Sequence, residues 1–349
     1  MNKRANENGA PRWRKLLIVK PTSLGDVVQS LCVPCALKRA FPDRFVGFLV
    51  SDALAELLEG HPCIDEVVPF PYRRLKSGSV FGAFRELRAR LRPGGWDVAA
   101  DLQGLARSGI AAWLSGAPLR VGYSDAREFS RLAYTHRIAS DRLAEHAVER
   151  YMKIAAFLGA DTAPVEFGLS ADEEDKERFL AAAGGEPPVV LVPGARWETK
   201  RWPAPFFAEL GRELHRRTGR RIVLLGSAAE AGLCAETARA IGPAALDISG
   251  RTTLSGLKAA LAAAALVVSN DSGPMHLAAA LGTPTVSIFG PTSPERVAPW
   301  GQERFVVRSG LDCAGCYRRK CHTMPPPCLA SIEPERVFEV CMKALDGRG

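Results

Sequence analysis

Two glycine-rich phosphate-binding patterns are absent from this 349-residue sequence. It contains neither G-x-G-x-x-G, which is typical of dinucleotide-binding domains, nor G-x-x-x-x-G-K-[ST], the Walker-type phosphate loop. The first absence disfavours an NAD-dependent oxidoreductase. Any phosphate of a ligand must therefore be held by other means.

Long hydrophobic runs are absent as well. The first fourteen residues are polar and lead into a short apolar run, so no signal-peptide core is visible. The longest apolar run, residues 259–268, is about half the length that a membrane-spanning helix requires. Nine cysteines in a chain of this size do not indicate a secreted disulfide scaffold. We expect a cytoplasmic protein, and peripheral contact with the cytoplasmic face of the inner membrane is a further hypothesis.

The composition describes a globular chain with an anionic partner. With 47% hydrophobic and 24% charged residues, the chain is long enough for two domains that each bury a core. Its net charge of +8 suits a nucleotide, a phosphorylated glycolipid or a membrane surface. Nucleic acid is not an expected partner, because the basic residues are scattered and no aromatic-basic module is visible.

Short apolar runs alternate with helical patterns along the chain, and this alternation restarts after a segment rich in Ala, Gly, Pro and acidic residues. Strands that alternate with helices predict parallel sheets covered on both faces. We therefore expect an α/β protein with two doubly wound domains that face each other across an inter-domain cleft. The expected boundaries are a first domain at 1–165, a linker at 166–188, a second domain at 189–332 with a cysteine-rich loop at 311–328, and a closing helix at 333–349.

The stretch Val267–Gly290 reads as strand, polar turn, helix and strand. Pro274 stands where a first helical residue tolerates proline. The helix start leaves backbone N–H groups unpaired beside Asp271, Ser272 and His276, which suits a phosphate or diphosphate. The alternative is that Asp271 or Ser272 only caps the helix and His276 packs in the core.

A second polar loop, residues 192–203, follows another expected strand and contains three cations. Arg196 and Lys200 are suited to meet phosphate oxygens through charge-assisted hydrogen bonds. The alternative is that these cations are solvated loop residues.

Asp26 lies where the first expected strand turns into the first expected helix. Because the carboxyl ends of parallel strands face the ligand crevice, its carboxylate could take a proton from a bound hydroxyl. A helix N-terminus stabilises the ionised form and lowers basicity, whereas loss of water raises it. Helix capping is the alternative role.

The cysteine-rich loop offers soft ligands for a structural zinc ion or an iron–sulfur cluster. Its spacing matches no recognised finger or ferredoxin pattern, so we favour free or paired thiols over a metal. The candidate ligands are Cys313, Cys316, Cys321 and Cys328.

Four stretches, taken in order, resemble the signature stretches of glycosyltransferase family 9, which contains the lipopolysaccharide core heptosyltransferases. They are Lys20–Gln29, Asp101–Ser108, Val192–Pro203 and Ser269–Ala280. The resemblance extends from about residue 15 to residue 340. It implies a GT-B fold, in which the first of two Rossmann-like domains binds the acceptor and the second binds an ADP-activated heptose.

The resemblance also implies the reaction and the residues that perform it. The expected reaction is single-displacement transfer of heptose, with inversion and without a required metal or cofactor, to an anionic inner-core acceptor such as Kdo-lipid A or a heptosylated core. Asp26 would be the general base and Lys200 would hold the diphosphate. The remaining expected site residues are Arg196, Thr199, Asp271, Ser272, Gly273 and His276 around the donor sugar and phosphates, Glu230 near the ribose, Thr252 near the adenine, and Gln103 and Arg107 on the acceptor side.

Two other readings remain open. A related enzyme could use another nucleotide sugar or decorate another surface glycan. A non-catalytic nucleotide-sugar binder could have kept the fold, although the joint presence of Asp26 and Lys200 disfavours it.

Overall fold

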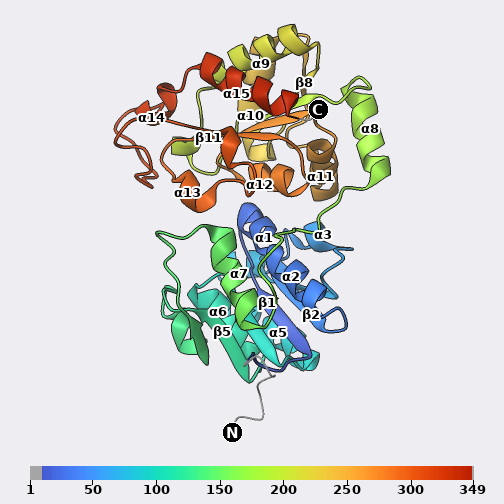
Figure 1. Ribbon diagram of the computed structural model, residues 1–349, viewed down its shortest axis with the longest axis vertical. Helices are drawn as coiled ribbons and strands as arrows, with labels where there is room; N and C mark the ends of the chain where they lie inside the picture. The colour runs from blue at the N-terminus through green and yellow to red at the C-terminus, as the bar shows by residue number, and fades with distance from the viewer. Residues whose placement is uncertain (1–9, 348–349) are drawn as a thin grey trace. The chain divides into compact units, whose positions relative to one another are not determined.

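The computed structural model of the chain describes residues 10–347 (Figure 1). The chain divides into two compact units, Met1–Gly168 and Leu169–Gly349. The expected lack of a signal-peptide core was inferred from residues 1–14, and residues 1–9 of that stretch lie outside the described part.

The first unit is built on a six-stranded parallel sheet with the strand order β3-β2-β1-β4-β5-β6. This order, which places the first strand in the middle, is that of a doubly wound fold. The strands are β1 Lys15–Val19, β2 Phe45–Ser51, β3 Glu66–Phe70, β4 Val98–Asp101, β5 Leu119–Tyr123 and β6 His136–Ile138.

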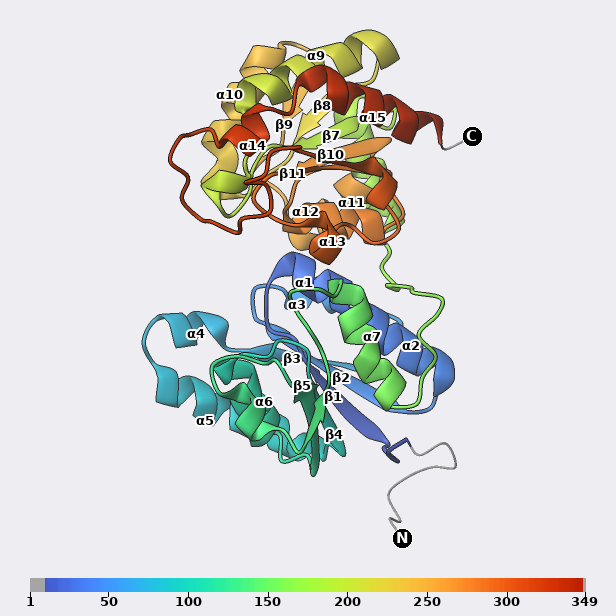
Figure 2. The same cartoon turned by 60° about the vertical axis from the view of Figure 1, so that its left-hand side comes forward.

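Helices cover both faces of this sheet. Figure 2 shows α1, α2 and α7 on one side and α4, α5 and α6 on the other. The helices are α1 Leu24–Ser30, α2 Cys32–Ala40, α3 Ala55–Leu58, α4 Tyr72–Lys76, α5 Val80–Leu91, η1 Arg92–Gly94, α6 Ala106–Leu114, η2 Ser130–Ala133 and α7 Ala147–Phe157.

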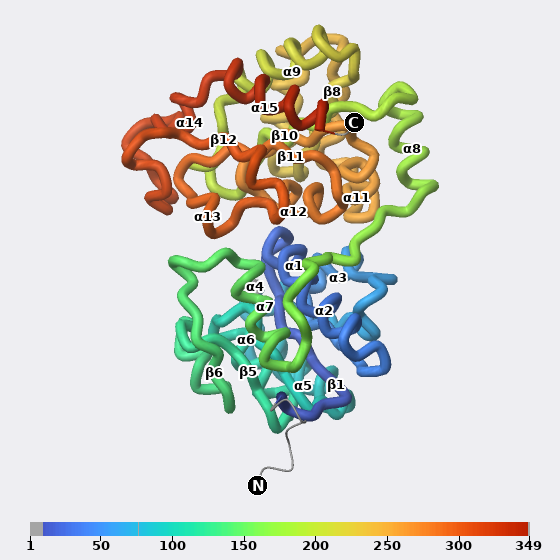
Figure 3. The backbone as a smooth tube through the Cα atoms, viewed as in Figure 1, coloured from blue at the N-terminus to red at the C-terminus, as the bar shows by residue number. Residues whose placement is uncertain are grey.

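The second unit repeats the plan with the strand order β12-β11-β10-β7-β8-β9, again parallel throughout. Its strands are β7 Val189–Val192, β8 Ile222–Leu224, β9 Ala245–Asp247, β10 Leu266–Asn270, β11 Thr285–Phe289 and β12 Val306–Arg308. Helix α9 packs against α10 and α15, and helix α11 packs against α8 and α12. Figure 3 traces the path of the backbone. The helices are α8 Glu173–Ala183, η3 Glu198–Lys200, α9 Ala204–Thr218, η4 Ala228–Glu230, α10 Ala231–Ile241, α11 Leu254–Ala262, α12 Gly273–Ala280, α13 Pro294–Val297, η5 Glu303–Phe305, α14 Pro327–Ala330 and α15 Pro334–Asp346.

Each sheet lies at the centre of its own core. The central strands are buried along nearly their whole length, which explains why they are continuous apolar runs rather than alternating ones. Trp96 packs among the first unit's core residues, and Trp202 packs in the second with Phe207 at a ring-centroid distance of 5.0 Å. The predicted α/β architecture, with two doubly wound domains, is confirmed.

The residue pattern at 27–40 predicts one helix, but the chain forms two helices, α1 and α2, which are divided at Leu31. Pro34 explains the division, because proline lacks the N–H that a continuous helix would use and its ring clashes with the carbonyl four residues earlier. The break ends α1 after two turns.

The segment expected to be a linker, residues 166–188, contains α8. Asp172 caps this helix by accepting from the backbone N–H of Asp175 at 3.1 Å, and Gly184 ends it with a φ of 103°. The Ser255 hydroxyl donates to the Asp175 carboxylate at 2.6 Å, so α8 is attached to α11 of the second unit.

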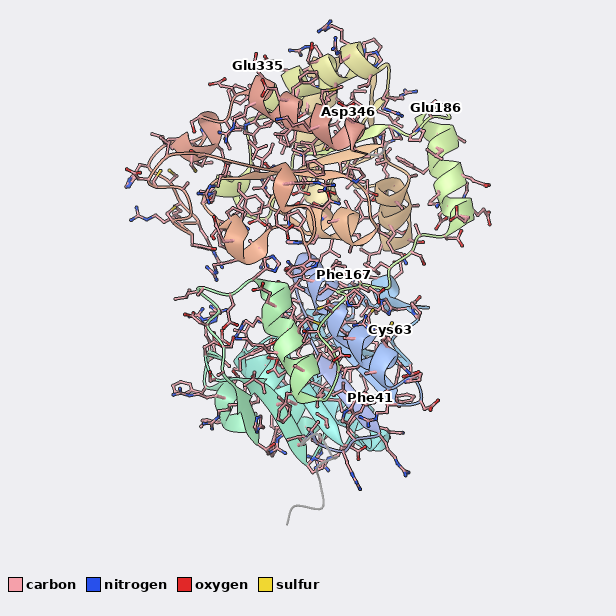
Figure 4. The ribbon with its side chains drawn as sticks, in the orientation of Figure 1. Phe41, Cys63, Phe167, Glu186, Glu335 and Asp346 are labelled. Atoms are coloured by element: carbon pink, nitrogen blue, oxygen red, sulfur yellow. The ribbon has the colours of Figure 1, made fainter. Side chains whose placement is uncertain are left out.

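The first unit ends at Gly168 beside the loop that precedes β3. The His61 imidazole and the Phe167 carbonyl are 2.8 Å apart, and the backbone N–H of Cys63 donates to the same ring; Figure 4 labels Phe167 and Cys63.

Within residues 10–347, every helix is too short or too polar to pass through a lipid bilayer.

Candidate active site

The loop between β1 and α1 presents Asp26. Its carboxylate accepts from the Ser23 backbone N–H at 3.1 Å and from the Ser23 hydroxyl at 2.6 Å. Asp26 therefore caps α1, as its position in the first turn allows. Its side chain is nevertheless 43% exposed, so the carboxylate can also contact a ligand.

Lys20 lies beneath this carboxylate. Its ammonium is 3.6 Å from the Asp26 carboxylate and 3.4 Å from the Leu102 carbonyl, and it lies over the Tyr151 ring. Burial lowers the pKa of Lys20, and the carboxylates of Asp26 and Asp101 oppose this effect. A cation at this distance favours the ionised form of Asp26.

The buried carboxylate of Asp101, at the end of β4, organises the neighbouring loop. It accepts from the backbone N–H groups of Gln103 (2.8 Å) and Gly104 (3.0 Å) and from the hydroxyls of Ser108 (2.8 Å) and Tyr134 (2.6 Å). Burial raises the pKa of Asp101, whereas these four hydrogen bonds lower it. The arrangement fixes the start of α6.

The two residues expected on the acceptor side contact the Asp26 loop. The Gln103 side-chain oxygen accepts from the Thr22 backbone N–H at 3.2 Å, and the Arg107 guanidinium donates to the Thr22 hydroxyl at 3.1 Å. The structure therefore brings Gln103, Arg107 and the Asp26 loop together at the carboxyl edge of the first sheet.

Changing Tyr134 to Phe should lower the free energy of unfolding by about 1–3 kcal/mol, because the buried Asp101 carboxylate loses a hydrogen-bond donor. Urea denaturation measures this change. Tyr123→Phe is a matched control, since Tyr123 is also buried and its hydroxyl has no hydrogen-bond partner among residues 10–347. Equal losses in the two variants would contradict a specific role for the Tyr134 hydroxyl.

In the second unit, Asn270 joins the two loops that the sequence singled out. Its side-chain amide donates to the Pro193 carbonyl at 2.8 Å, and its side-chain oxygen accepts from the Trp202 backbone N–H at 3.0 Å. The loop after β7 is therefore held against the end of β10.

This connection brings Lys200 to Asp271. The Lys200 ammonium is 2.6 Å from the Asp271 carboxylate, which also accepts from the Thr292 hydroxyl at 2.6 Å. The side chains of Lys200 and Asp271 are 17% and 7% exposed, and the ammonium lies over the Trp197 ring. Lys200 is thus a shielded cation with a buried counter-ion rather than a solvated loop residue.

The helix that follows, α12, begins at Gly273 with Ser272 as its N-cap residue. The Ser272 and Ser269 hydroxyls are 3.0 Å apart, and His276 is buried one turn into the helix. The α12 start thus lies directly after Asp271, and its first N–H groups have no partner within an α-helix.

Glu230 and Gly194 lie against each other. The Glu230 carboxylate accepts from the Ser227 backbone N–H at 2.9 Å and from the Ser227 hydroxyl at 2.7 Å. A Cβ atom added to Gly194 would come within 2.3 Å of this carboxyl group, so Gly194 leaves the space that the Glu230 carboxyl group occupies beside the β7 loop. Thr252 lies in the loop before α11 and is half-buried.

The two remaining donor-side candidates differ in exposure. Arg196 is exposed. Thr199 is buried, and its hydroxyl donates to the Arg318 carbonyl at 3.0 Å. In this structure Thr199 therefore links the polar loop at residues 192–203 to the cysteine-rich loop by a hydrogen bond.

Several polar residues of the two sites were not predicted. Lys20 directly follows an apolar run, and Asp101 ends another. A polar residue at the end of an apolar run is a signal for the carboxyl end of a strand. Tyr134, Tyr151 and Thr292 have no comparable signal, because their contacts arise only when distant segments pack together.

The four candidate thiols differ in exposure. Cys313 and Cys316 are exposed, Cys321 is half-buried and Cys328 is buried, and none forms a disulfide. Burial, and then the neighbouring cysteines, raise the pKa of Cys328 to about 11. Across residues 10–347, no group of three or more His, Cys, Asp or Glu side chains is arranged to hold a metal ion.

Comparisons with known proteins agree with this architecture. The model of glycosyltransferase family 9 (heptosyltransferase) matches residues 84–325. Lipopolysaccharide heptosyltransferase 1 of Pseudomonas aeruginosa is 30% identical over 343 residues, which cover 93% of this chain and 96% of that relative. The solved structure of Escherichia coli ADP-heptose lipopolysaccharide heptosyltransferase II has a TM-score of 0.77 and 25% identity, with 96% of this chain and 99% of that chain covered. The structure of an E. coli heptosyltransferase solved with ADP has a TM-score of 0.77 and 24% identity, with 95% of this chain and 99% of that chain covered.

Two Rossmann-like units, together with the likeness to solved heptosyltransferase structures, place the chain in the GT-B fold class. Within that class, the chain belongs to glycosyltransferase family 9, the heptosyltransferase family. It is a glycosyltransferase of the lipopolysaccharide heptosyltransferase type, as the sequence resemblance implied.

Proposed function

We propose that this enzyme transfers a heptose from ADP-heptose to an anionic inner-core acceptor of lipopolysaccharide, with inversion and without a required metal or cofactor. The observation that carries the proposal is that each unit has its own polar site: a partly exposed carboxylate in the first unit, and a shielded ammonium beside the start of α12 in the second. A relative is named a lipopolysaccharide heptosyltransferase, and an E. coli heptosyltransferase was solved with ADP-2-deoxy-2-fluoro heptose.

The second unit supplies the chemistry for the leaving group. As the bond between the sugar and ADP breaks, negative charge develops on the diphosphate. Lys200 and the first N–H groups of α12 stabilise this charge, because preorganised donors are effective where water is excluded. Arg196 and His276 would add donors to the phosphates, and Glu230 and Thr252 would contact the ribose and adenine.

The first unit supplies the chemistry for the acceptor. The acceptor hydroxyl oxygen attacks the anomeric carbon and forms the new glycosidic bond while the bond to ADP breaks. Asp26 takes the hydroxyl proton. The Lys20 ammonium keeps Asp26 ionised before the reaction, and Gln103 and Arg107 hold the loop that carries it.

The reaction also defines the partners and the place of action that we propose. The partners are a nucleotide sugar and an anionic glycolipid, with no nucleic acid. The enzyme would act in the cytoplasm, in peripheral contact with the inner membrane where the glycolipid is anchored.

An assay of ADP release by the purified enzyme tests the proposal. ADP-heptose should support turnover with a Kdo-lipid A or heptosylated-core acceptor, and ADP-glucose and UDP-sugars should not. Turnover with another nucleotide sugar alone would favour the alternative donor. Tight ADP-heptose binding without turnover on any acceptor would instead indicate a non-catalytic binder.

A further inference from the structure

Exposed apolar side chains are concentrated on one helical layer of the first unit. Among residues 10–347, the large apolar side chains that are well exposed include a group on and beside α6 and η2. We call this group the α6–η2 patch; it consists of Ile110 (39% exposed), Trp113 (58%), Phe129 (77%) and Leu132 (74%). Apolar groups exposed together mark interaction surfaces, whereas single ones do not.

The packing of α6 against η2 makes the patch one surface. A Cβ atom added to Gly109 of α6 would lie 3.0 Å from Ser130 of η2, so the two backbones are in close contact. The Arg127 backbone N–H donates to the Gly104 carbonyl at 2.9 Å, which holds the segment before η2 at the start of α6. Ile110 and Trp113 are three residues apart and therefore share a face of α6.

The surface around the patch is strongly basic. Residues 72–94, which form α4, α5 and η1, contain seven Arg or Lys and one Glu, a formal charge of +6 in a chain whose net charge is +8. Helix α5 packs beside α6 on the same side of the sheet (Figure 2). The single acidic residue, Glu86, is already paired with Arg74 and Arg90, so it does not offset the remaining cations.

Cations extend onto the patch itself. Arg85 and Arg88 of α5 are exposed, and so are Arg127 and Arg131 beside the apolar side chains. Glu128, also exposed, accepts from the Ala106 backbone N–H at the start of α6. Exposed aromatic and leucine side chains with arginines beside them are a combination that binds the interface of an anionic bilayer. The apolar groups enter the headgroup region and the cations attract anionic lipids.

We propose that the α6–η2 patch docks the enzyme on an anionic lipid bilayer. The proposal rests on the proposed function, in which the acceptor is a glycolipid anchored in a membrane. Docking through this face would place the enzyme at the surface that contains its second substrate.

Vesicle co-sedimentation tests the docking without any acceptor. The wild-type protein should sediment with vesicles of phosphatidylglycerol and phosphatidylcholine, but much less with phosphatidylcholine alone. The variant Trp113→Ser/Phe129→Ser/Leu132→Ser should partition at least about tenfold more weakly, because three apolar side chains no longer enter the interface. High salt should weaken wild-type binding, since the cationic contribution is screened.

Leu311→Ser/Met324→Ser provides the matched control. These side chains are also exposed, at 42% and 49%, but they lie in the second unit, so this variant should bind vesicles as the wild type does. Equal vesicle binding by the triple variant and the wild type would overturn the proposal. A wild-type dimer that the triple variant converts to a monomer would overturn it too, and would assign the patch to contact between copies of the chain.

A second readout separates this proposal from the proposed function. The triple variant should release ADP at the wild-type rate with a deacylated acceptor that does not enter membranes. If the wild type binds anionic vesicles but transfers no heptose to any acceptor, the proposed function fails and the docking surface stands. If the wild type transfers heptose but does not bind anionic vesicles, the docking proposal fails and the proposed function stands.

Discussion

Replacing Asp26 by Asn should lower kcat for heptose transfer by about 10²- to 10⁴-fold, the contribution expected of a general base. The amide keeps the size of the side chain but cannot take the acceptor proton. Initial rates of ADP release at saturating donor and acceptor measure the effect. Donor affinity should stay near that of the wild type, because Asp26 lies in the other unit from the donor-side loops.

Because Asp26 also caps α1, loss of stability must be separated from loss of chemistry. Ser23→Ala removes the 2.6 Å hydrogen bond to Asp26 but leaves the carboxylate in place. It should reduce the free energy of unfolding by about 1 kcal/mol and change kcat only slightly. If Asp26→Asn retained most of the wild-type kcat, the assignment of the base would be wrong.

Replacing Lys200 by Ala should lower kcat/KM by about 10²- to 10³-fold, the range seen when one preorganised donor to a developing charge is removed. The same change leaves the buried Asp271 carboxylate with the Thr292 hydroxyl but without its cation. Loss of one partner of a buried pair is destabilising, so the variant should also unfold at lower urea concentration. Steady-state kinetics and urea denaturation measure the two effects.

The double variant Lys200→Ala/Asp271→Asn distinguishes the two effects. It should recover most of the lost stability, because no unpaired carboxylate remains, but it should stay inactive. Recovery of transfer would mean that Lys200 only neutralises Asp271. Arg196→Ala serves as the control in the same loop, since this exposed cation should contribute only a few-fold.

Much of the fold could be predicted from the sequence, because buried parallel strands are continuous apolar runs that stand out between helical patterns. The elements that could not be predicted are the least periodic ones. Strands β6, β9 and β12 have three residues each, lie at the edges of their sheets and are only partly buried, so they do not stand out as apolar runs. The segment around α8 has a composition typical of a linker, yet a capped helix forms there and packs on α11.

The candidate site residues could also be predicted only in part. Asp26, Lys200 and Asp271 follow strand ends or lie in polar loops, so their residue types and positions point to them. Their partners do not follow from local sequence: Lys200 and Asp271 are 71 positions apart, and Tyr134 reaches Asp101 across 33. Such contacts depend on the packing of whole elements.

The ion pair between Lys200 and Asp271 has a consequence for turnover. In this structure the ammonium already has an internal anion, so a diphosphate that binds as we propose would have to displace Asp271 from Lys200. In the proposed mechanism, Asp271 would pair with the ammonium again as ADP leaves. If Lys200 binds the diphosphate as proposed, this exchange would lower the affinity for ADP and for other phosphates and so favour product release.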